Sequence, residues 1–450
     1  MGARAGNHCR LATGISPPTE GRSVALEIFR RVRAGDLADR AMEAAARGLP
    51  QRDRQWTHEL VYGALRLRGR MDHLLAQRVR GGLDHLEADV LDVLRLGAYQ
   101  LLEMGSVPAY AAISQSVELT RAAGAPRAAG LVSGVLHALS RSNLGSAFPD
   151  AERQPLEHMV AWGSHPRWLV ERWSDRWGVE SARRLVEANN RRPELYILPL
   201  GSASGSAHER LRARGIGTAE VAIAPGGLQL LPPATARDAL ASVGAVVQDP
   251  AAQLVTRYAA VPEGAGVLDL CAAPGGKALA LAQRAQFVVA ADLSLGRLRR
   301  VRDNVQRLGA EKRVGMVAAD ARHAPFATAD LVLLDVPCTG TGTLRRHPDA
   351  RWRITPEDLG ALAVLQAEIL EGAASHVRPG GWLVYATCAL EPEENELQIE
   401  RFLDMHPEFE SDPVPDAVDS SLLSDRGWLH VLPQNTGTDG AFAARLRKRG

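Results

Sequence analysis

The chain has 450 residues, of which 46% are hydrophobic and 23% charged, and its formal net charge is +1. That length predicts roughly two to four domains, and a near-neutral charge neither requires nor excludes a nucleic-acid partner. No apolar run approaches the ~18 residues that span a bilayer, and residues 1–19 lack the apolar core of a signal peptide. We therefore expect a cytoplasmic protein that does not enter a membrane.

The cysteines are too few and too scattered for a structural role. Cys9, Cys271, Cys338 and Cys388 are the only four, and none lies in a C-x-x-C pair. A disulfide framework needs more of them, and a structural zinc site needs paired cysteines or a histidine cluster. We expect neither, and no metal.

The first 145 residues divide into a short tail and a helical domain. Residues 1–20 are predicted to be a flexible N-terminus. From Gly21 onward apolar residues such as Leu26, Phe29 and Val32 recur at helical spacing, which predicts an all-α domain with short connections. Its first half is rich in arginine, and these side chains form either an RNA-facing surface or ordinary solvated helix faces: Arg30, Arg31, Arg33, Arg52, Arg54, Arg66, Arg68 and Arg70.

Two phrases of this helical part carry a family resemblance. ELVYGALRLRGRMDHLL and VLRLGAYQLLEMGSVPAYAAISQSVEL resemble the NusB-type RNA-binding domain found at the amino end of RsmB/Sun-type rRNA methyltransferases. The resemblance implies a NusB-like domain over residues 21–145. It further implies, over residues 155–245, a helical linker and a small RNA-contacting α/β region. The segment Glu194–Pro199 departs from the family pattern, and the Gly/Ser-rich run from Gly201 to Ser206 predicts a loop.

The remaining sequence alternates strand and helix patterns. VLDLCAAPGGK, residues 267–277, predicts a strand, a glycine turn and the start of a helix. Further strands are predicted at residues 287–291, 314–318, 331–334 and 382–386, with helices at 294–308 and 355–377. Such alternation is typical of a doubly wound, mainly parallel, Rossmann-like sheet.

Aspartates mark the ends of four consecutive predicted strands: Asp269, Asp292, Asp320 and Asp335. Any one of them could simply cap a strand. The first turn lacks the G-x-G-x-x-G spacing of a dinucleotide site, and four carboxylates around one crevice would repel a diphosphate. S-adenosylmethionine carries a sulfonium and no phosphate, so the set favours that cofactor.

Cys338 and Cys388 each follow the end of a predicted strand. Isolated cysteines are more often buried in a core, but these two lie in turn-like contexts, and neighbouring strands would bring their sulfurs together. A thiolate that adds to carbon 6 of cytosine activates carbon 5 for methylation, which is covalent catalysis. Methylation of a nitrogen or a ribose oxygen needs no thiol, so two cysteines favour a carbon target.

The motif series DLCAAPGGK, DVPCTGTG, LRRHPDARWRI and YATCALEPEENE is similar to that of RNA cytosine-C5 methyltransferases of the RsmB/Sun branch, which modify small-subunit ribosomal RNA. The resemblance implies that Cys388 is the nucleophile and that Cys338 helps release the product. Asp335 is close to Cys338 in the sequence, which makes it a candidate to hydrogen-bond the cytosine or to aid proton transfer. It also implies a set of cofactor-contacting residues: Cys271, Ala272, Ala273, Pro274, Gly275, Gly276, Lys277, Asp292, Asp320 and Asp335.

The sequence thus predicts a class I S-adenosylmethionine-dependent methyltransferase domain over residues 246–450, closed by a carboxy-terminal hairpin. We expect a monomer that methylates carbon 5 of a cytidine in small-subunit (16S) ribosomal RNA. Two alternatives stay open from the sequence: the same reaction on tRNA or another RNA, and a non-catalytic RNA-binding factor in ribosome assembly.

Overall fold

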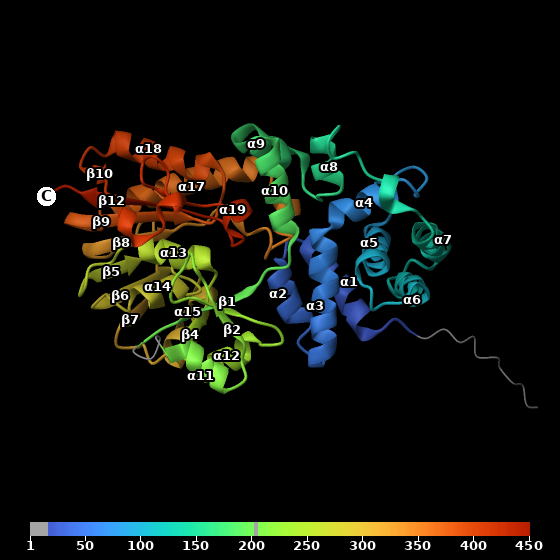
Figure 1. Cartoon of the computed structure of the whole chain (residues 1–450), viewed down its shortest axis with the longest axis horizontal. Helices are drawn as coiled ribbons and strands as arrows, with labels where there is room; N and C mark the ends of the chain where they lie inside the picture. The colour runs from blue at the N-terminus through green and yellow to red at the C-terminus, as the bar shows by residue number, and fades with distance from the viewer. Residues whose placement is uncertain (1–16, 202–205) are drawn as a thin grey trace, which may run out of the picture. The chain divides into compact units, whose positions relative to one another are not determined.

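The chain divides into two compact units, and the division falls between Val186 and Glu187. The structure is a computed structural model that describes residues 17–201 and 206–450 (Figure 1). Most of the predicted flexible N-terminus, up to residue 16, lies outside the described residues.

The first unit is helical, as the sequence predicts. Its apolar stripes meet in one core that contains Ile28, Leu60, Leu94 and Leu136. Pro108 lies between two of its helices, directly before Ala109. In chain order the helices are α1 (Glu20–Arg33), α2 (Ala38–Ala45), α3 (Gln51–Arg66), α4 (Arg68–Ala76), α5 (Ala88–Glu103), α6 (Ala109–Ala122), α7 (Ala129–Ser140), α8 (Pro155–Ala161) and α9 (Arg167–Trp177), with α10 (Val179–Asn190) crossing into the second unit.

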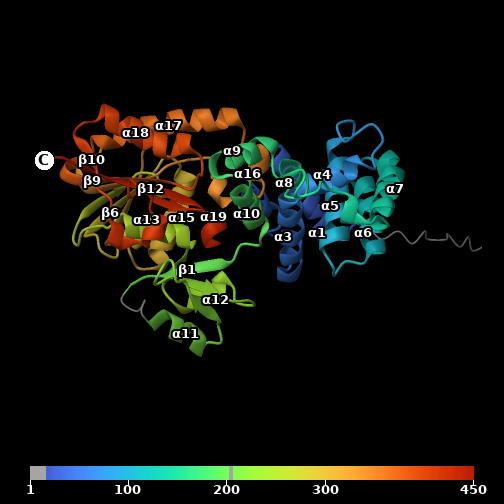
Figure 2. The same cartoon turned by 45° about the horizontal axis from the view of Figure 1, so that its top comes forward.

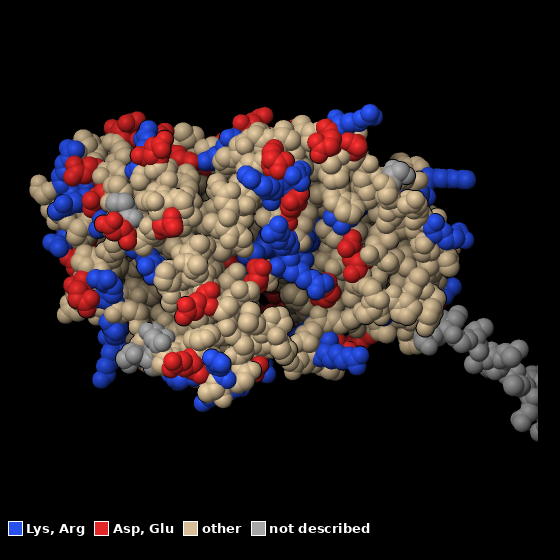
Figure 3. Space-filling view, in the orientation of Figure 1, with Lys and Arg blue, Asp and Glu red and all other residues tan. Residues whose placement is uncertain are grey.

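Several arginines of this unit join helices to one another. Arg30 and Arg33 of α1 lie 2.7 and 2.6 Å from the Asp89 carboxylate of α5. Arg70 of α4 pairs with Glu103 at the end of α5 at 3.1 Å. The guanidinium groups of these side chains thus hold helices together, and those of Arg30 and Arg33 also stay partly exposed, so both interpretations of the arginine-rich half stay open. On the face shown in Figure 3, basic and acidic side chains are interspersed.

The second unit begins with a small antiparallel sheet of order β2-β3-β1-β4. Ile197, Leu211, Leu228 and Ala239 lie in its core. The predicted α/β region is therefore present, although residues 202–205 of its predicted loop lie outside the described residues. Its elements are β1 (Leu195–Pro199), α11 (Ala207–Ala213), β2 (Thr218–Glu220), β3 (Leu228–Leu230), α12 (Ala236–Ser242) and β4 (Ala245–Val247).

A larger sheet of order β10-β12-β9-β8-β5-β6-β7 follows, with β11 paired to β12. Strands β5 to β9 are parallel, and β10, β11 and β12 run antiparallel to their neighbours. This confirms the Rossmann-like prediction. The strands are β5 (Gly266–Asp269), β6 (Phe287–Asp292), β7 (Val314–Ala318), β8 (Ala329–Asp335), β9 (Val377–Thr387), β10 (Phe409–Ser411), β11 (Leu429–Val431) and β12 (Ala441–Lys448).

Helices cover both faces of this sheet (Figure 2). Alternate residues of β8 enter different cores: Leu331 and Leu333 pack on the side of α13 (Pro250–Tyr258), α14 (Gly276–Leu281) and α15 (Leu295–Arg307). Val332 and Leu334 pack on the side of α17 (Pro356–Ala374) and α18 (Glu396–Met405). Burial on both faces explains why β8 reads as an uninterrupted apolar run. Two short helices, α16 (Ala350–Arg353) and α19 (Pro433–Thr436), complete the unit.

The predicted boundary between the helix at 355–377 and the strand at 382–386 differs most from the structure. The helix that was expected to reach Val377 ends at Ala374, and β9 already begins at Val377, where it pairs with Ala329 of β8. The pairing shifts register between Ala329 and Leu331, and Gly380 has a positive φ of 75°. Residues 378–381, Arg-Pro-Gly-Gly, therefore lie inside β9, although the sequence predicts a strand only from residue 382. A bulge in the strand absorbs the extra residues.

Thr355 caps the long helix α17, and its replacement tests the cap. Its side chain accepts the Asp358 N–H at 3.2 Å, while Asp358 accepts the Thr355 N–H at 3.0 Å, which forms a capping box. Replacement of Thr355 by Ala should lower the free energy of unfolding by about 1 kcal/mol, measured by urea denaturation. Thr355→Ser keeps the oxygen and should match the wild type; equal losses in both variants would contradict the role of the cap.

Candidate active site

The parallel strands bring the predicted site residues to one edge of the large sheet. Asp269 at the end of β5 lies opposite Ala290 of β6 and Leu333 of β8. Asp292 and Asp335 are the last residues of β6 and β8. Since the carboxyl ends of parallel strands share one edge, the loops that follow them surround one crevice, where doubly wound sheets bind ligands.

The glycine turn after β5 is packed closely against α15. Gly275 has a φ of +99°, and its N–H donates to the carbonyl oxygen of Ala272 at 2.7 Å. A Cβ atom at Gly275 would lie 3.0 Å from Val301 of α15. Glycine is required here both by the backbone conformation and by this close approach. The turn thereby exposes backbone to the crevice.

Asp292 and Asp320 are held in different ways. Asp292 is buried, and its two oxygens accept the backbone N–H groups of Ala273 at 3.3 Å and Ser294 at 2.9 Å, so it ties the glycine turn to the start of α15. Asp320 accepts hydrogen bonds from the backbone N–H, the Nε–H and the Nη2 group of Arg322, which lower the pKa of its carboxyl group to about 2. Both residues lie at or just after the carboxyl ends of their strands, on the edge of the sheet that carries the glycine turn, as predicted.

Asp269 is the exception among the four strand-end aspartates, because it is fully buried. Neither of its carboxyl oxygens has a hydrogen-bond partner among the described residues. Burial, followed by the charge of Asp335, raises its pKa to about 8. Asp269 is thus largely protonated at neutral pH and adds little charge to the crevice, unlike the sequence interpretation in which all four carboxylates act together.

Lys277 and Asp335 form an ion pair across the crevice, with 2.6 Å between Nζ and Oδ2. Burial alone would lower the pKa of Lys277, but the Asp335 carboxylate and then the Cys388 sulfur raise it above its ordinary value. The ammonium group is therefore fixed between the glycine turn and the loop that carries Cys338. Asp335 also keeps part of its surface exposed, 30% of the side chain.

The two predicted cysteines are brought together. Their sulfurs lie 3.4 Å apart, because β8 and β9 are neighbours with Asp335 opposite Ala386. The hydrogen bond with Cys388, together with burial and the charge of Glu394, raises the pKa of the Cys338 thiol well above its usual range. Cys271 lies apart from this pair in the glycine turn, and burial raises the pKa of its thiol as well.

The loops of the two cysteines are also bonded to each other. The Gly342 N–H donates to the carbonyl oxygen of Cys388 at 2.9 Å, and the Thr341 hydroxyl accepts the Leu390 N–H at 2.8 Å. A Cβ atom at Gly342 would lie 2.7 Å from that carbonyl oxygen. Thr341 and Gly342 therefore hold the Cys388 backbone beside Cys338.

A cavity of about 260 Å³ opens next to Lys277 and Asp335. Part of its lining was not assigned a role from the sequence: Tyr196, Gln248, Asp249, Arg346 and Asp439. The Arg346 guanidinium donates to Asp439 at 2.6 Å and also to Asp249, and it donates to the carbonyl oxygen of Glu194 at 3.0 Å. Burial and the charge of Asp249 raise the pKa of Asp439 to about 6. In the sequence, only the charged residues of LRRHPD (residues 344–349) and VVQDP (residues 246–250) could have pointed to this part of the cavity lining.

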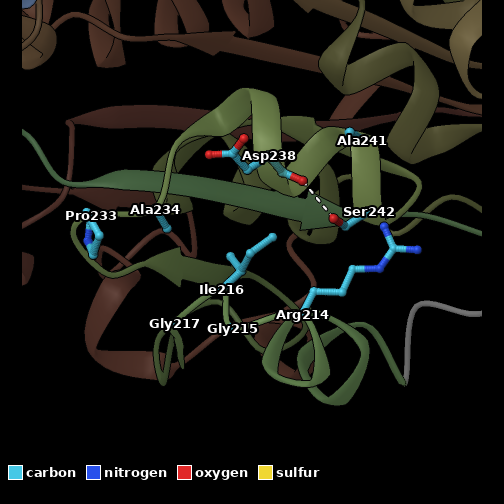
Figure 4. A pocket seen from close by; sticks show the side chains of 9 residues that line it. All are labelled: Arg214, Gly215, Ile216, Gly217, Pro233, Ala234, Asp238, Ala241 and Ser242. Carbon is cyan, nitrogen blue, oxygen red and sulfur yellow. Dashed lines mark hydrogen bonds between the residues drawn. The ribbon is translucent and has the colours of Figure 1, made fainter. Parts of the chain in front are cut away.

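A separate hollow lies in the small antiparallel sheet region, lined by Arg214, Ile216, Pro233, Asp238 and Ser242 (Figure 4). The Ser242 hydroxyl donates to the Asp238 carbonyl oxygen at 2.7 Å. None of the predicted cofactor residues or cysteines lines it, so we assign the chemistry to the crevice of the large sheet. In the described part of the chain no group of three or more His, Cys, Asp or Glu could hold a metal ion, and no helix is long and apolar enough to cross a membrane.

Three family profiles match successive parts of the chain. The NusB family matches residues 19–141, a ferredoxin-like domain of RsmF/B-like methyltransferases matches 165–236, and the 16S rRNA methyltransferase RsmB/F family matches 258–447. Together they reach into both units and cover the glycine turn and the motifs of both cysteines. The order of the three domains agrees with the order of the folds in the structure.

Relatives match over almost the whole length. Ribosomal RNA small subunit methyltransferase B of Klebsiella pneumoniae is 33% identical over 95% of this chain and 98% of its own. The protein of the same name from Vibrio cholerae is 33% identical over 95% of this chain and 97% of its own. The crystal structure of PH0851 covers 96% of this chain and 99% of its own, with a TM-score of 0.78 and 25% identity.

The raised pKa of Asp269 predicts a pH-dependent cost to stability. The unfolded carboxyl group loses its proton near pH 4 and the folded one near pH 8, so the stability of the folded state falls as pH rises between these values. Asp269→Asn cannot titrate. The free energy of unfolding of this variant relative to wild type should therefore rise from pH 5 to pH 8, by up to about 1.4 kcal/mol for each pH unit. The melting temperature of the variant minus that of the wild type should rise over the same range.

Thermal denaturation of both proteins across that pH range checks this prediction. Asp303→Asn, which changes an exposed aspartate of α15, serves as the control and should follow the wild type at every pH. A constant difference between Asp269→Asn and wild type from pH 5 to pH 8 would show that Asp269 is ionised throughout.

Proposed function

Because the chain belongs to the RsmB/F family of 16S rRNA methyltransferases, we propose that it methylates carbon 5 of a cytidine in small-subunit ribosomal RNA, with S-adenosylmethionine as donor and a covalent cysteine–cytosine intermediate. The observation that carries the proposal is the pair of sulfurs, Cys338 and Cys388, 3.4 Å apart at the crevice. A non-catalytic RNA-binding protein has no need of two thiols in this position.

The thiol pair fits the electronic demand of carbon 5. Carbon 5 of cytosine is a weak nucleophile until a thiolate adds to carbon 6. In our proposal the Cys388 sulfur forms this bond, and carbon 5 then becomes enamine-like and takes the methyl group. Loss of the carbon 5 proton and cleavage of the carbon–sulfur bond return Cys388 to its starting state. Such covalent catalysis divides one difficult step into easier ones.

Cys338 and Asp335 are assigned the remaining roles. Cys338 lies next to the attacking sulfur, and we assign it to the release of the methylated base. Asp335, oriented by its ion pair with Lys277, is assigned to contact the cytosine or to aid proton transfer. A carboxylate held in this way keeps one orientation toward the adjoining cavity.

The described residues fit S-adenosylmethionine, which supplies an electrophilic methyl group when bound. We assign the cofactor site to the turn from Cys271 to Lys277 together with Asp292, Asp320 and Asp335. The support is the cavity of about 260 Å³ that adjoins this turn, because Ala272, Pro274, Gly276, Lys277 and Asp335 line it. Carboxylates at strand ends also suit ribose hydroxyls and an amino group better than a diphosphate.

RNA contacts are assigned to the parts before the catalytic domain. We propose that residues 21–145 form an RNA-binding domain and that residues 155–245 contribute a further RNA-contacting region, ahead of a catalytic domain over residues 246–450. The support is the match to the NusB family and to the ferredoxin-like domain of RsmF/B-like methyltransferases. The partner is ribosomal RNA of the small subunit.

Replacement of Cys388 by Ala should abolish methyl transfer, because no thiolate can then add to carbon 6. Incorporation of tritium from labelled S-adenosylmethionine into small-subunit rRNA of a strain that lacks the gene measures this, and bisulfite sequencing locates the cytidine. RNA binding should stay within about twofold of wild type, because one small side chain changes. Cys9→Ala, which removes the cysteine outside the matched domains, is the control; full activity of Cys388→Ala would overturn the mechanism.

Replacement of Cys338 by Ala should instead trap the covalent intermediate, because addition and methylation still occur while release is slowed. A protein–RNA adduct that survives a denaturing gel is the expected result. The double variant Cys338→Ala/Cys388→Ala should form none, which ties the adduct to Cys388. Loss of turnover without any adduct would show that the two cysteines divide the work differently.

A further inference from the structure

Glu394 is fully buried in the loop that follows Cys388. Its carboxylate accepts hydrogen bonds from Thr339 in the loop of Cys338. It lies in the short turn η5 (Pro392–Glu394). Its Oε1 accepts the Thr339 N–H at 2.8 Å and the Gln366 side-chain amide at 2.9 Å, and its Oε2 accepts the Thr339 hydroxyl at 2.5 Å. Three donors meeting two oxygens is the pattern of an ionised carboxylate.

The surroundings of the two sulfurs therefore differ in charge. On the side of Cys388 lies the Lys277 ammonium group, whose pKa is raised by the Asp335 carboxylate and by Cys388 against the effect of burial. On the side of Cys338 lies the Glu394 carboxylate, bonded to the residue next to Cys338. In a buried site a negative charge opposes a second negative charge nearby, whereas a positive charge favours it.

Other ionisable groups around the pair do not alter this asymmetry. They are Tyr385, whose hydroxyl donates to the carbonyl oxygen of Glu394 at 2.6 Å, Glu391, whose charge acts on Glu394, and Asp335, which is paired with Lys277. Burial raises the pKa of Glu394, and its hydrogen bonds from Thr339 and Gln366 oppose that rise. The contact with Cys388, burial and the charge of Glu394 all favour the neutral form of Cys338.

We propose that Glu394 is a positioning residue that decides which of the two cysteines is the nucleophile. It fixes the Cys338 loop through Thr339 and keeps the proton of the pair on Cys338, so that Cys388 carries the free electron pair. The inference rests on the proposed function and deepens it, because the family match does not explain why two adjacent sulfurs take different roles.

The proton and electron balance of this arrangement is simple. By geometry either sulfur could be the donor across the 3.4 Å between them, and we assign the proton to Cys338, whose S–H group then donates to the Cys388 sulfur. A lone pair of Cys388 forms the bond to carbon 6, and Cys338 retains its proton during this step. After methylation the carbon 5 proton leaves to a base, and the electron pair of the carbon–sulfur bond returns to Cys388. No oxidant or further reactant is required.

Alkylation of the intact wild-type protein provides the first test. The full chain, kept reduced with a phosphine, is treated briefly with iodoacetamide between pH 6 and pH 10, and initial labelling of each cysteine is measured by mass spectrometry. We expect Cys388 to react at least about tenfold faster than Cys338 at pH 7.5, the difference made by one pKa unit. Equal labelling of the two sulfurs at that pH would overturn the proposal without any variant.

Glu394→Gln is the decisive variant, because it preserves shape and removes only charge. Its amide oxygen can still accept from Thr339 and Gln366, and its NH₂ group can donate to the Thr339 hydroxyl. The labelling profile of Cys338 should shift to lower pH, and the preference for Cys388 should narrow by about tenfold. Glu394→Asp retains the charge and should keep most of the preference. Glu393→Gln, which removes a carboxylate from the same turn, should leave the preference unchanged.

A second pair of variants separates the effect of Glu394 on Cys338 from the effect of the Cys388 sulfur. In Cys388→Ala the remaining Cys338 has no sulfur neighbour, and addition of Glu394→Gln should still shift its labelling to lower pH. A shift of similar size in both backgrounds supports a direct charge effect. An unchanged labelling profile in both would show that Glu394 has only a packing role, whatever the loss of activity.

The two proposals fail in distinguishable ways. If Cys388→Ala still transfers methyl groups, the proposed mechanism is wrong, regardless of how the cysteines are labelled. If Cys388→Ala is inactive but Glu394→Gln labels like wild type, the mechanism stands and the role of Glu394 is overturned.

Discussion

The pairing of β8 with β9 is the constraint on which the active site depends. The two strands are parallel, and Asp335 lies opposite Ala386, so the segments that leave them start side by side. Within three residues each segment reaches a cysteine, and the sulfurs come to lie 3.4 Å apart. A slip of one residue in this register would turn the side chains of one strand to the opposite face. The two hydrophobic cores, which take alternate residues of β8, exclude such a slip.

Several buried charges around that pairing are held by hydrogen bonds or ion pairs. Glu394 receives three hydrogen bonds, Lys277 is paired with Asp335, and Arg346 is bonded to Asp249 and Asp439. Removing one partner from such a pair costs far more than the pair contributes, because the other charge is left buried and alone. These networks therefore fix loop positions. Asp269 stands apart, since the protein keeps it neutral by burial instead of pairing it.

The helical unit uses charge for a different purpose. Arginines of α1 and α4 form ion pairs with carboxylates of α5. Part of the arginine-rich sequence in the first half of this unit therefore links helices to one another. Counting basic residues along a helix cannot separate these roles, because the partners lie far away in the chain: Arg30 and Asp89 are 59 residues apart. The positive charge that a helical domain offers to a partner can be judged only when arginines with ion-pair partners inside the domain are left out of the count.

The sequence by itself determined the element order, the Rossmann-like class and the family, because these follow from local periodicity, caps such as Thr355 and short motifs. It also placed Cys338 and Cys388 at strand ends, but their proximity required strands to be neighbours, which strand order alone decides. The tertiary structure decided the rest: that Asp269 is buried and protonated while Asp335 is paired, and that Glu394, a residue in an acidic run, lies beneath Cys338. Burial and long-range pairing set these properties, and neither is written in the local sequence.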